Sequence, residues 1–220
     1  MVSMVVAGLV LAGVSAVTIN QVRAVDAAEK RNAATLQTAG ALDQVAKQLR
    51  TATALGSPPR AFITASAEEV GFYANVFSLD QSTAAGKRAA QRPQEVWLWT
   101  RTSGNRRQLC GQVRPLSWTA AGDPVLPSTP SLATASARTC RVLVDDLAAA
   151  DAVPTFTYLR ATDQLGTSGT SVSTIASASG AVTDTTAVQA VEVRLRAKAD
   201  TSRGSNVVTS VARVTLLSQS

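Results

Sequence analysis

The first 22 residues of the chain carry no ionised side chain, and their apolar residues lie on every side of a helix. Residues 1–19 read MVSMVVAGLVLAGVSAVTI, and the first ionised side chain belongs to Arg23. A helix of about 22 residues is roughly 33 Å long, which matches the hydrocarbon thickness of a bilayer. A helix in a soluble core has an apolar stripe instead. The pattern therefore predicts a transmembrane helix over residues 1–22.

The helix is predicted to continue as an amphipathic rod over residues 23–56. Residues 20–54 contain no proline and a single glycine, and they are rich in Ala, Gln, Lys, Arg and Leu. Leu42, Val45 and Leu49 recur at i, i+3 and i+7, which gives an apolar stripe, and Ser57-Pro58-Pro59 ends the helix. The two parts together form one rod of some 50 residues, roughly 80 Å long. A cleaved signal peptide is disfavoured because no basic residue precedes the apolar run.

From Phe62 onward the pattern changes to short runs that alternate between apolar and polar residues. The clearest run is AVEVRLRAK over residues 190–198, in which Val191, Val193 and Leu195 face inward. A polar turn over 200–205 and the run 206–217 complete a hairpin at the edge of an antiparallel sheet with one solvated face. Further strands are predicted at residues 70–78, 95–101, 107–113, 140–144 and 155–160.

The order of these elements predicts an α+β fold, with a long N-terminal helix followed by a β-rich head over residues 57–220. Two stretches of the head are predicted to be loops. Residues 82–93 are polar and basic, and residues 162–187 form a low-complexity segment of Ser, Thr, Gly and Ala that we expect to be mobile.

Two cysteines, Cys110 and Cys140, are predicted to form a disulfide that closes a loop of about 30 residues. The alternative is a pair of separate buried thiols. Trp97 and Trp99 alternate with apolar residues in the strand 95–101, so they share one face. They are expected to pack under long loops or against the helix, the alternative being a stacking platform for single-stranded DNA.

The net charge of +6 is concentrated in the segment 87–114, which contains seven basic residues and a single acidic one, Glu95. Such a segment attracts nucleic acid or anionic lipid, although a solvated strand-and-loop surface is the favoured interpretation. The candidate nucleic-acid contacts are Lys87, Arg88, Arg92, Arg101, Arg106, Arg107 and Arg114.

The sequence offers no recognisable catalytic arrangement. It contains no histidine, which excludes Ser-His and Cys-His pairs and His-ligated metal sites, and it lacks the common nucleotide-binding and hydrolase motifs. Asp145, Asp146 and Asp151 could hold a hard cation, but solvated carboxylates are the favoured interpretation. We therefore expect neither catalysis nor a bound cofactor.

Small residues recur every four positions on one face of the first helix, at Gly8, Ala12 and Ala16. This spacing lets helix backbones approach closely in lipid and marks the predicted helix-packing residues.

The chain resembles type IV pilin-like proteins, most closely the PulJ/GspJ/PilW group of minor pilins and pseudopilins. The residues that carry the resemblance are LVLAGVSA at 9–16, QLRTATA at 48–54, EEVGFYAN at 68–75, QEVWLW at 94–99 and the hairpin over 190–217. Members of the family begin with a basic leader, a glycine and Phe-Thr-Leu-Val-Glu, which do not precede the apolar run here. We expect a start codon upstream of Met1, the alternatives being a truncated chain or a divergent relative.

The resemblance implies a structural minor pilin or pseudopilin of a type IV pilus, competence or type II secretion filament. Such a subunit is a single-pass cell-membrane protein with an extracytoplasmic head, and its N-terminal helix contacts lipid and the inner-membrane assembly platform before it packs against other pilins in a surface filament. Two alternatives remain, a DNA-capturing pilin that uses segment 87–114 and a membrane-anchored extracellular β-domain unrelated to filaments.

Overall fold

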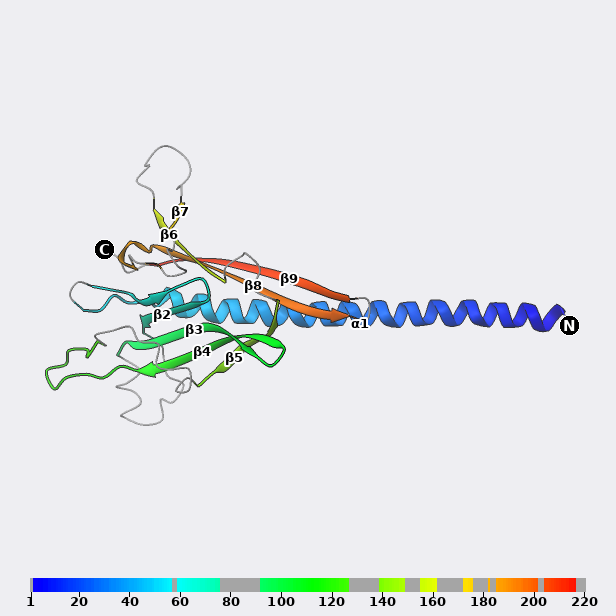
Figure 1. Cartoon of the computed structure of the whole chain (residues 1–220), viewed down its shortest axis with the longest axis horizontal. Coiled ribbons are helices and arrows are strands. Elements are labelled where there is room, and N and C mark those ends of the chain that lie inside the picture. Colours follow the sequence, from blue (N-terminus) through cyan, green and yellow to red (C-terminus); the bar gives the residue numbers. More distant parts are fainter. Residues whose placement is uncertain are drawn as a thin grey trace.

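The computed structural model describes residues 2–56, 59–75, 92–126, 139–148, 155–161, 172–175, 182, 185–201 and 204–216. Side chains are described for these residues except at 2–10, 12, 161, 172–174, 186, 200–201 and 204–205. The molecule consists of one long helix and a head built around the C-terminal part of that helix, while the N-terminal part of the helix projects away from the head as a stem (Figure 1).

Helix α1 spans Val2–Arg50 without interruption. Its stretch of 49 residues contains no proline and is rich in strong helix formers. Ser and Thr side chains within it bond back to the helix itself, as Ser15 Oγ does to the Leu11 carbonyl at 2.8 Å and Thr18 Oγ1 to the Val14 carbonyl at 2.9 Å. These bonds satisfy the hydroxyls locally, so the residues fit a mostly apolar helical surface.

The strands of the head belong to one antiparallel sheet that curls around the helix. Their order is β1-β2-β3-β4-β5-β8-β6-β7, and β9 pairs with β8. The strands are β1 (Phe62–Ala65), β2 (Glu69–Ala74), β3 (Gln94–Ser103), β4 (Arg106–Pro115), β5 (Arg141–Leu147), β6 (Phe156–Ala161), β7 (Val172–Thr174), β8 (Ala190–Thr201) and β9 (Gly204–Thr215), with a short 3-10 helix η2 (Thr185–Ala187) before β8.

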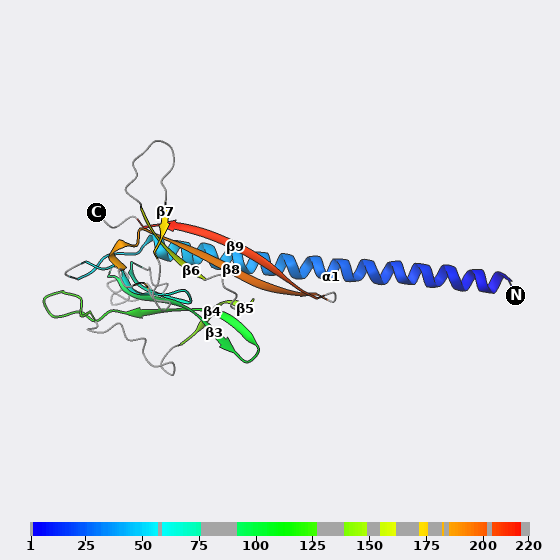
Figure 2. The same ribbon diagram turned by 45° about the horizontal axis from the view of Figure 1, so that its top comes forward.

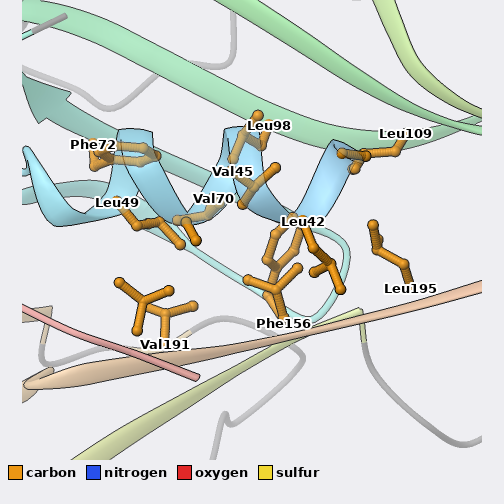
Figure 3. Packing of buried hydrophobic residues seen from close by; sticks show 14 of the residues in the cluster. Leu42, Val45, Leu49, Val70, Phe72, Leu98, Leu109, Phe156, Val191 and Leu195 are labelled. Atoms are coloured by element: carbon orange, nitrogen blue, oxygen red, sulfur yellow. The ribbon is translucent and has the colours of Figure 1, made fainter. Parts of the chain in front are cut away.

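The core lies between the C-terminal part of α1 and the concave side of the sheet. Val45 and Leu49 of the helix are fully buried. They meet apolar side chains from β2, β3 and β4 on one side and from β6 and β8 on the other (Figure 3). The predicted stripe of Leu42, Val45 and Leu49 is therefore confirmed, and Asp43 stays exposed beside it.

The predicted final hairpin is also confirmed, but not its place at the edge of the sheet, because β8 pairs with β5 and β6 as well as with β9. Strands β8 and β9 pair over their whole length from Ala190↔Thr215 to Thr201↔Gly204, and they run alongside the helix in both views (Figure 1, Figure 2). Val191, Val193 and Leu195 are fully buried, as the alternation predicted. A hydrogen bond of 2.9 Å between Thr38 Oγ1 of α1 and Ser210 Oγ of β9 links the hairpin to the helix.

The structure differs from the prediction at one helix end, one missed strand and one predicted loop. The helix ends at Arg50 rather than near residue 56, because the backbone after it pairs with β2: the Thr53 amide donates to the Tyr73 carbonyl at 2.8 Å. The short strand β1 was not predicted. Within the predicted loop 162–187, the described residues include strand β7 and the buried residue Val182, whose amide donates to the Ala65 carbonyl at 2.7 Å.

Candidate functional site

The stem of α1, defined as residues 11–33, presents apolar side chains to solvent. The exposed fractions of its large apolar residues are 67% for Leu11, 59% for Val14, 56% for Val17, 51% for Ile19, 64% for Val22 and 58% for Val25. Among the described side chains of α1, the first buried one is that of Ala34. The stem is therefore an unpartnered apolar surface, whereas the following 16 residues, Ala34 to Leu49, supply the helical part of the core.

Most of the exposed large apolar residues of α1 lie on the opposite side of the helix from its buried residues. At 3.6 residues per turn, Leu11, Val14, Val22 and Val25 align in one stripe, and the stripe continues to Leu36, which is 74% exposed. The core-facing residues, with Val45 near their centre, fall about half a turn away. From Leu11 to Leu36 the stripe thus faces away from the core side of the helix, which leaves it open to a partner.

Only one of the three predicted helix-packing residues has a described side chain. Ala16 is exposed on the stem, while the side chains of Gly8 and Ala12 lie outside the described ones. The backbone at all three positions is helical. Near Gly13, the next small residue along, an added Cβ would meet no atom within 4 Å.

The predicted transmembrane helix over residues 1–22 is not found. Among the described residues, no helix combines the length and the apolar character needed to cross a membrane. Between Leu11 and Ala34 the helix carries charged and polar side chains besides its apolar ones, including an exposed pair between Asp26 and Lys30 at 3.1 Å.

Arginines of the basic segment that the structure describes are engaged with neighbouring groups rather than gathered into one patch. Arg101 Nε donates to Gln108 Oε1 at 3.1 Å, and Arg106 forms an ion pair of 3.1 Å with Asp145 of β5. Arg106 and Arg107 are consecutive in β4, so their side chains leave the sheet on opposite faces.

Arg107 belongs to a polar network that joins five segments of the head. Its guanidinium pairs with Glu68 and donates to the Ala148 carbonyl at 3.1 Å. Glu68 also accepts a hydrogen bond from the Thr100 hydroxyl, and the Arg107 guanidinium lies 3.4 Å from Thr155 Oγ1. Since only 16% of the Arg107 side chain is exposed, this residue holds strands together and offers little surface to a nucleic acid.

The other basic candidates are also dispersed. The guanidinium of Arg92 lies over the ring of Trp118, 4.9 Å from its centroid. Arg114 stands opposite Glu95 in the β3–β4 ladder and has an interaction of its own. Lys87 and Arg88 lie outside the described residues. The geometry therefore does not bring the described members of segment 87–114 together into a single cationic surface.

Trp97 and Trp99 are each only 6% exposed and pack with Cys110 in a second small cluster. This cluster lies on the other face of β3 from Val96 and Leu98, which join the main core. The predicted burial of the rings is confirmed, and a buried ring cannot stack on a base, but the rings pack beside the disulfide rather than against the helix. Gly71 makes room for Trp97: a Cβ there would meet the indole at 2.8 Å.

The predicted disulfide is confirmed. Cys110 and Cys140 are bonded, with their Cα atoms 5.1 Å apart. The Cys110 side chain is fully buried among the tryptophans, and the bond connects β4 to the start of β5. Together with the β4–β5 pairing, it fixes the two strands to each other.

Among the described residues, no group of three or more acidic or cysteine side chains is placed to hold a metal ion. Asp145 accepts hydrogen bonds from Gln108 Nε2 at 3.0 Å and from Arg106 at 3.1 Å. These bonds, that of Gln108 foremost, lower the pKa of Asp145 below its ordinary value. Asp146 adopts a left-handed backbone conformation with φ of 61°, and Asp151 lies outside the described residues.

No protein-family model, no curated protein and no solved structure matches the chain. The resemblance to type IV pilin-like proteins therefore stays a prediction, and the functional interpretation depends on the geometry of this chain. Within that geometry the most distinctive feature is the exposed apolar stem.

Proposed function

We propose that the chain is a structural subunit of a pilin-like filament, a minor pilin or pseudopilin that assembles through its N-terminal helix. The observation that carries the proposal is the stem: a helix continuous with the core of the head, yet bare of partners and apolar over residues 11–25. Large exposed apolar surfaces on a folded protein mark sites of interaction.

The energy available from covering the stem supports this role. Burial of a Val, Leu or Ile side chain contributes about 1.5–3 kcal/mol. The six large apolar side chains of the stem are roughly half exposed, so a partner that covers them completely gains about 1 kcal/mol from each. The sum of about 6 kcal/mol, before the entropic cost of association, is of the size needed for helix packing that repeats along a filament.

A helix surface of this kind suits neighbours that are helices too. The stem carries small residues such as Ala16 beside its valines, and its hydroxyls bond within the helix, as those of Ser15 and Thr18 do. Such a surface allows close backbone approach. In this proposal the partners are other pilins or pseudopilins, with membrane lipid and an inner-membrane assembly platform as contacts before assembly.

The disulfide supports an extracytoplasmic position for the head. Disulfides persist in oxidising compartments and are rare in the cytosol, and this one joins two strands of the head. The proposed location of the head is outside the cytoplasm, in a cell-surface filament. The system served, whether a type IV pilus, competence or type II secretion filament, is part of the prediction that the resemblance implies.

Cysteine cross-linking in the cells that produce the protein tests the proposal. The native cysteines are bonded to each other, so a single introduced thiol reports on one contact. Val14→Cys and Val25→Cys should give covalent dimers and larger species under oxidising conditions, because stems pack on stems. The control is Ser103→Cys, an exposed position in the β3–β4 hairpin of the head, which should give markedly less.

A second variant separates assembly from folding. Val14→Lys combined with Val22→Lys places two charges in the exposed stripe and should prevent cross-linking through Val25→Cys. The head should still form its disulfide, since neither residue contacts the core. Cross-linking that persists with both lysines in place, or that is no greater than in the Ser103→Cys control, would contradict assembly through the stem and favour an anchored extracellular domain.

The DNA-capturing alternative receives less support. Arg106 and Arg107 are both ion-paired, and the two described tryptophans of β3 are buried. Charge reversal at the exposed Arg106, which leaves the Arg107 network in place, should therefore leave any salt-dependent DNA binding unchanged. Loss of such binding would instead restore segment 87–114 as a nucleic-acid site.

A further inference from the structure

Strand β9 is the outer strand of the C-terminal hairpin, and one of its two edges is open. β9 pairs with β8 along its whole length, and β8 lies between it and strands β2–β5 (Figure 1). Among the described residues, no backbone group of β9 bonds to any strand other than β8. A free strand edge of this kind is a template for pairing with another chain.

The hydrogen bonds of β8 show which groups of β9 face the free edge. The Arg194 amide donates to the Thr155 carbonyl at 2.8 Å, so Arg194 directs its backbone groups away from β9. Its partner in the ladder, Val211, therefore belongs to a non-hydrogen-bonded pair and directs its own amide and carbonyl to the free edge. Because the pattern alternates along an antiparallel pair, the same holds for Val207, Thr209, Arg213 and Thr215.

The β9 edge also lacks the features that commonly protect a sheet edge. The strand is 12 residues long, pairs with β8 without a register shift and contains no proline. Strand β1, by contrast, has only four residues and a register irregularity after Phe62, and β7 has three residues. Short or irregular edges discourage pairing, whereas a long and regular edge favours it.

The side chains of β9 that face α1 are incompletely covered. On β8 the inward-facing Val193 and Leu195 are fully buried. Val208 and Ala212 of β9 lie on the same face of the sheet and pack against the core, but they are only partly buried. A strand added at the free edge would cover these side chains and pair the open backbone groups at the same time.

The outer face of the hairpin carries a surplus of positive charge. Among its described side chains four are basic and only Glu192 is acidic, which gives a net charge of +3. Glu192 is shared by two guanidiniums, 3.1 Å from that of Arg194 and 3.0 Å from that of Arg213. The other two basic residues are Lys198 and Arg196, the latter with a further interaction of its own. Carboxylates on the outward face of an added strand would complement this charge.

We infer that the free edge of β9 binds an extended segment of another protein, in which apolar residues that face α1 alternate with acidic residues that face outward. A second copy of the chain fits less well. Antiparallel pairing of two β9 strands would place two basic faces side by side. Since β9 runs in the same direction as α1 (Figure 2), it would also turn the two helices in opposite directions. The edge lies on the head, so binding there does not depend on how the stem assembles.

Binding of synthetic peptides to the full chain tests the inference. The chain is kept in solution with a mild detergent, and fluorescence anisotropy follows a labelled peptide that alternates valine and glutamate, with detergent alone as the blank. Saturable binding is expected, and a peptide that alternates valine and lysine should bind more weakly. Residues of a hydrogen-bonded pair lie on the same face of the sheet, so the glutamate amides of the bound peptide point towards β9. N-methylation of the glutamates should therefore abolish binding, whereas N-methylation of the valines, the matched control, should not.

Variants of β9 locate the site. Val211→Pro removes an amide that points to the free edge and leaves the ladder with β8 intact, so the head should fold and peptide binding should be lost. Val211→Thr keeps that amide and should bind as the native chain does. Arg213→Gln should weaken binding of the glutamate peptide about two- to fivefold, the contribution of one exposed ion pair. The Val14→Lys and Val22→Lys double variant should bind the peptide unchanged.

Several results would overturn the inference. One is the absence of saturable binding at millimolar peptide. Others are equal binding of the two N-methylated peptides, equal binding of the lysine and glutamate peptides, and binding that survives Val211→Pro. A dimer in solution that Val211→Pro dissociates would assign the edge to a second copy instead.

Discussion

Opening the Cys110–Cys140 disulfide should destabilise the head by several kcal/mol. The bond joins residues 30 positions apart. In the loop-entropy description, closing a loop of about 30 residues removes about 12 cal/mol/K from the unfolded chain, or about 3.6 kcal/mol at 25 °C. The β4–β5 pairing that already brings the cysteines together does not reduce this figure, since the constraint acts on the unfolded state.

A second contribution comes from packing. Cys110 is fully buried against Trp97 and Trp99, so Cys110→Ala together with Cys140→Ala also leaves a small void. The loss is about 1 kcal/mol, similar to one buried methylene. The double variant should therefore be less stable than the oxidised protein by about 4.5 kcal/mol, and the reduced native protein by about 3.6 kcal/mol.

Urea unfolding followed by tryptophan fluorescence measures both differences. With a slope near 3 kcal/mol/M, typical of a chain at the larger end of single domains, the double variant should unfold about 1.5 M earlier than the oxidised protein. Adding reductant to the double variant controls for effects of the reductant itself. A difference below about 1 kcal/mol between the oxidised and the reduced native protein would refute the loop-entropy reasoning.

Three further predictions concern the core, the polar network and pH. Leu49→Ala should cost about 2–5 kcal/mol in urea unfolding because the residue is fully buried, whereas Leu36→Ala, on the exposed stripe, should cost almost nothing. Arg107→Met should lower the free energy of unfolding by about 1–3 kcal/mol, because Glu68 loses its guanidinium partner. The Arg106 side chain is 63% exposed, so Arg106→Met should lower it by under about 0.5 kcal/mol. Equal losses in the two variants would contradict the role of the network. Burial, reinforced by Glu95, raises the pKa of Tyr73 to about 12, so its contribution to stability is complete below about pH 10 and disappears as the pH rises towards 12. Ultraviolet titration should then detect no phenolate near pH 10 until the chain unfolds; its appearance in the folded protein would contradict this.

The sequence predicted the parts of the fold that depend on local periodicity. Apolar and polar residues alternate over nine residues in β8, and the two faces alternate over seven residues in β3. The sequence therefore predicts where these strands lie and which faces are buried. Strand β1 has only four residues, and β7 lies in a stretch of Ser, Thr, Gly and Ala without apolar alternation. Short segments of this kind become strands through pairing with neighbours that are distant in sequence.

The candidate sites also differ in how far local sequence predicts them. The apolar stem and the cysteine pair follow from composition and spacing. The dispersal of the basic segment depends on partners such as Asp145, 39 positions from Arg106, and these become visible only once the strands are paired. A pocket of about 420 Å³ on the head is the extreme case, because only the packing of α1 against β4 and β5 brings Gln48 to the same pocket as Arg141.

The unequal packing of α1 has a consequence for its dynamics. Helices derive most of their stability from tertiary contacts rather than from propensity. Residues 38–49 have those contacts and the stem does not. In the unassembled protein the two parts of one continuous helix should therefore differ in local stability, because opening of the stem exposes no core residue.

Amide hydrogen exchange should detect this difference. Amides of residues 14–25 are expected to exchange at least 100-fold faster than those around Val45 and Leu49, since about 3 kcal/mol or more of packing protects the latter. Val14→Lys should not change this pattern in the unassembled chain, because Val14 has no contact with the head. Once subunits assemble through the stem, the same amides should become protected in the native protein but not in the lysine variant. Equal protection of both parts before assembly would mean that the stem is stabilised by something other than packing, and would remove the need for a partner along it.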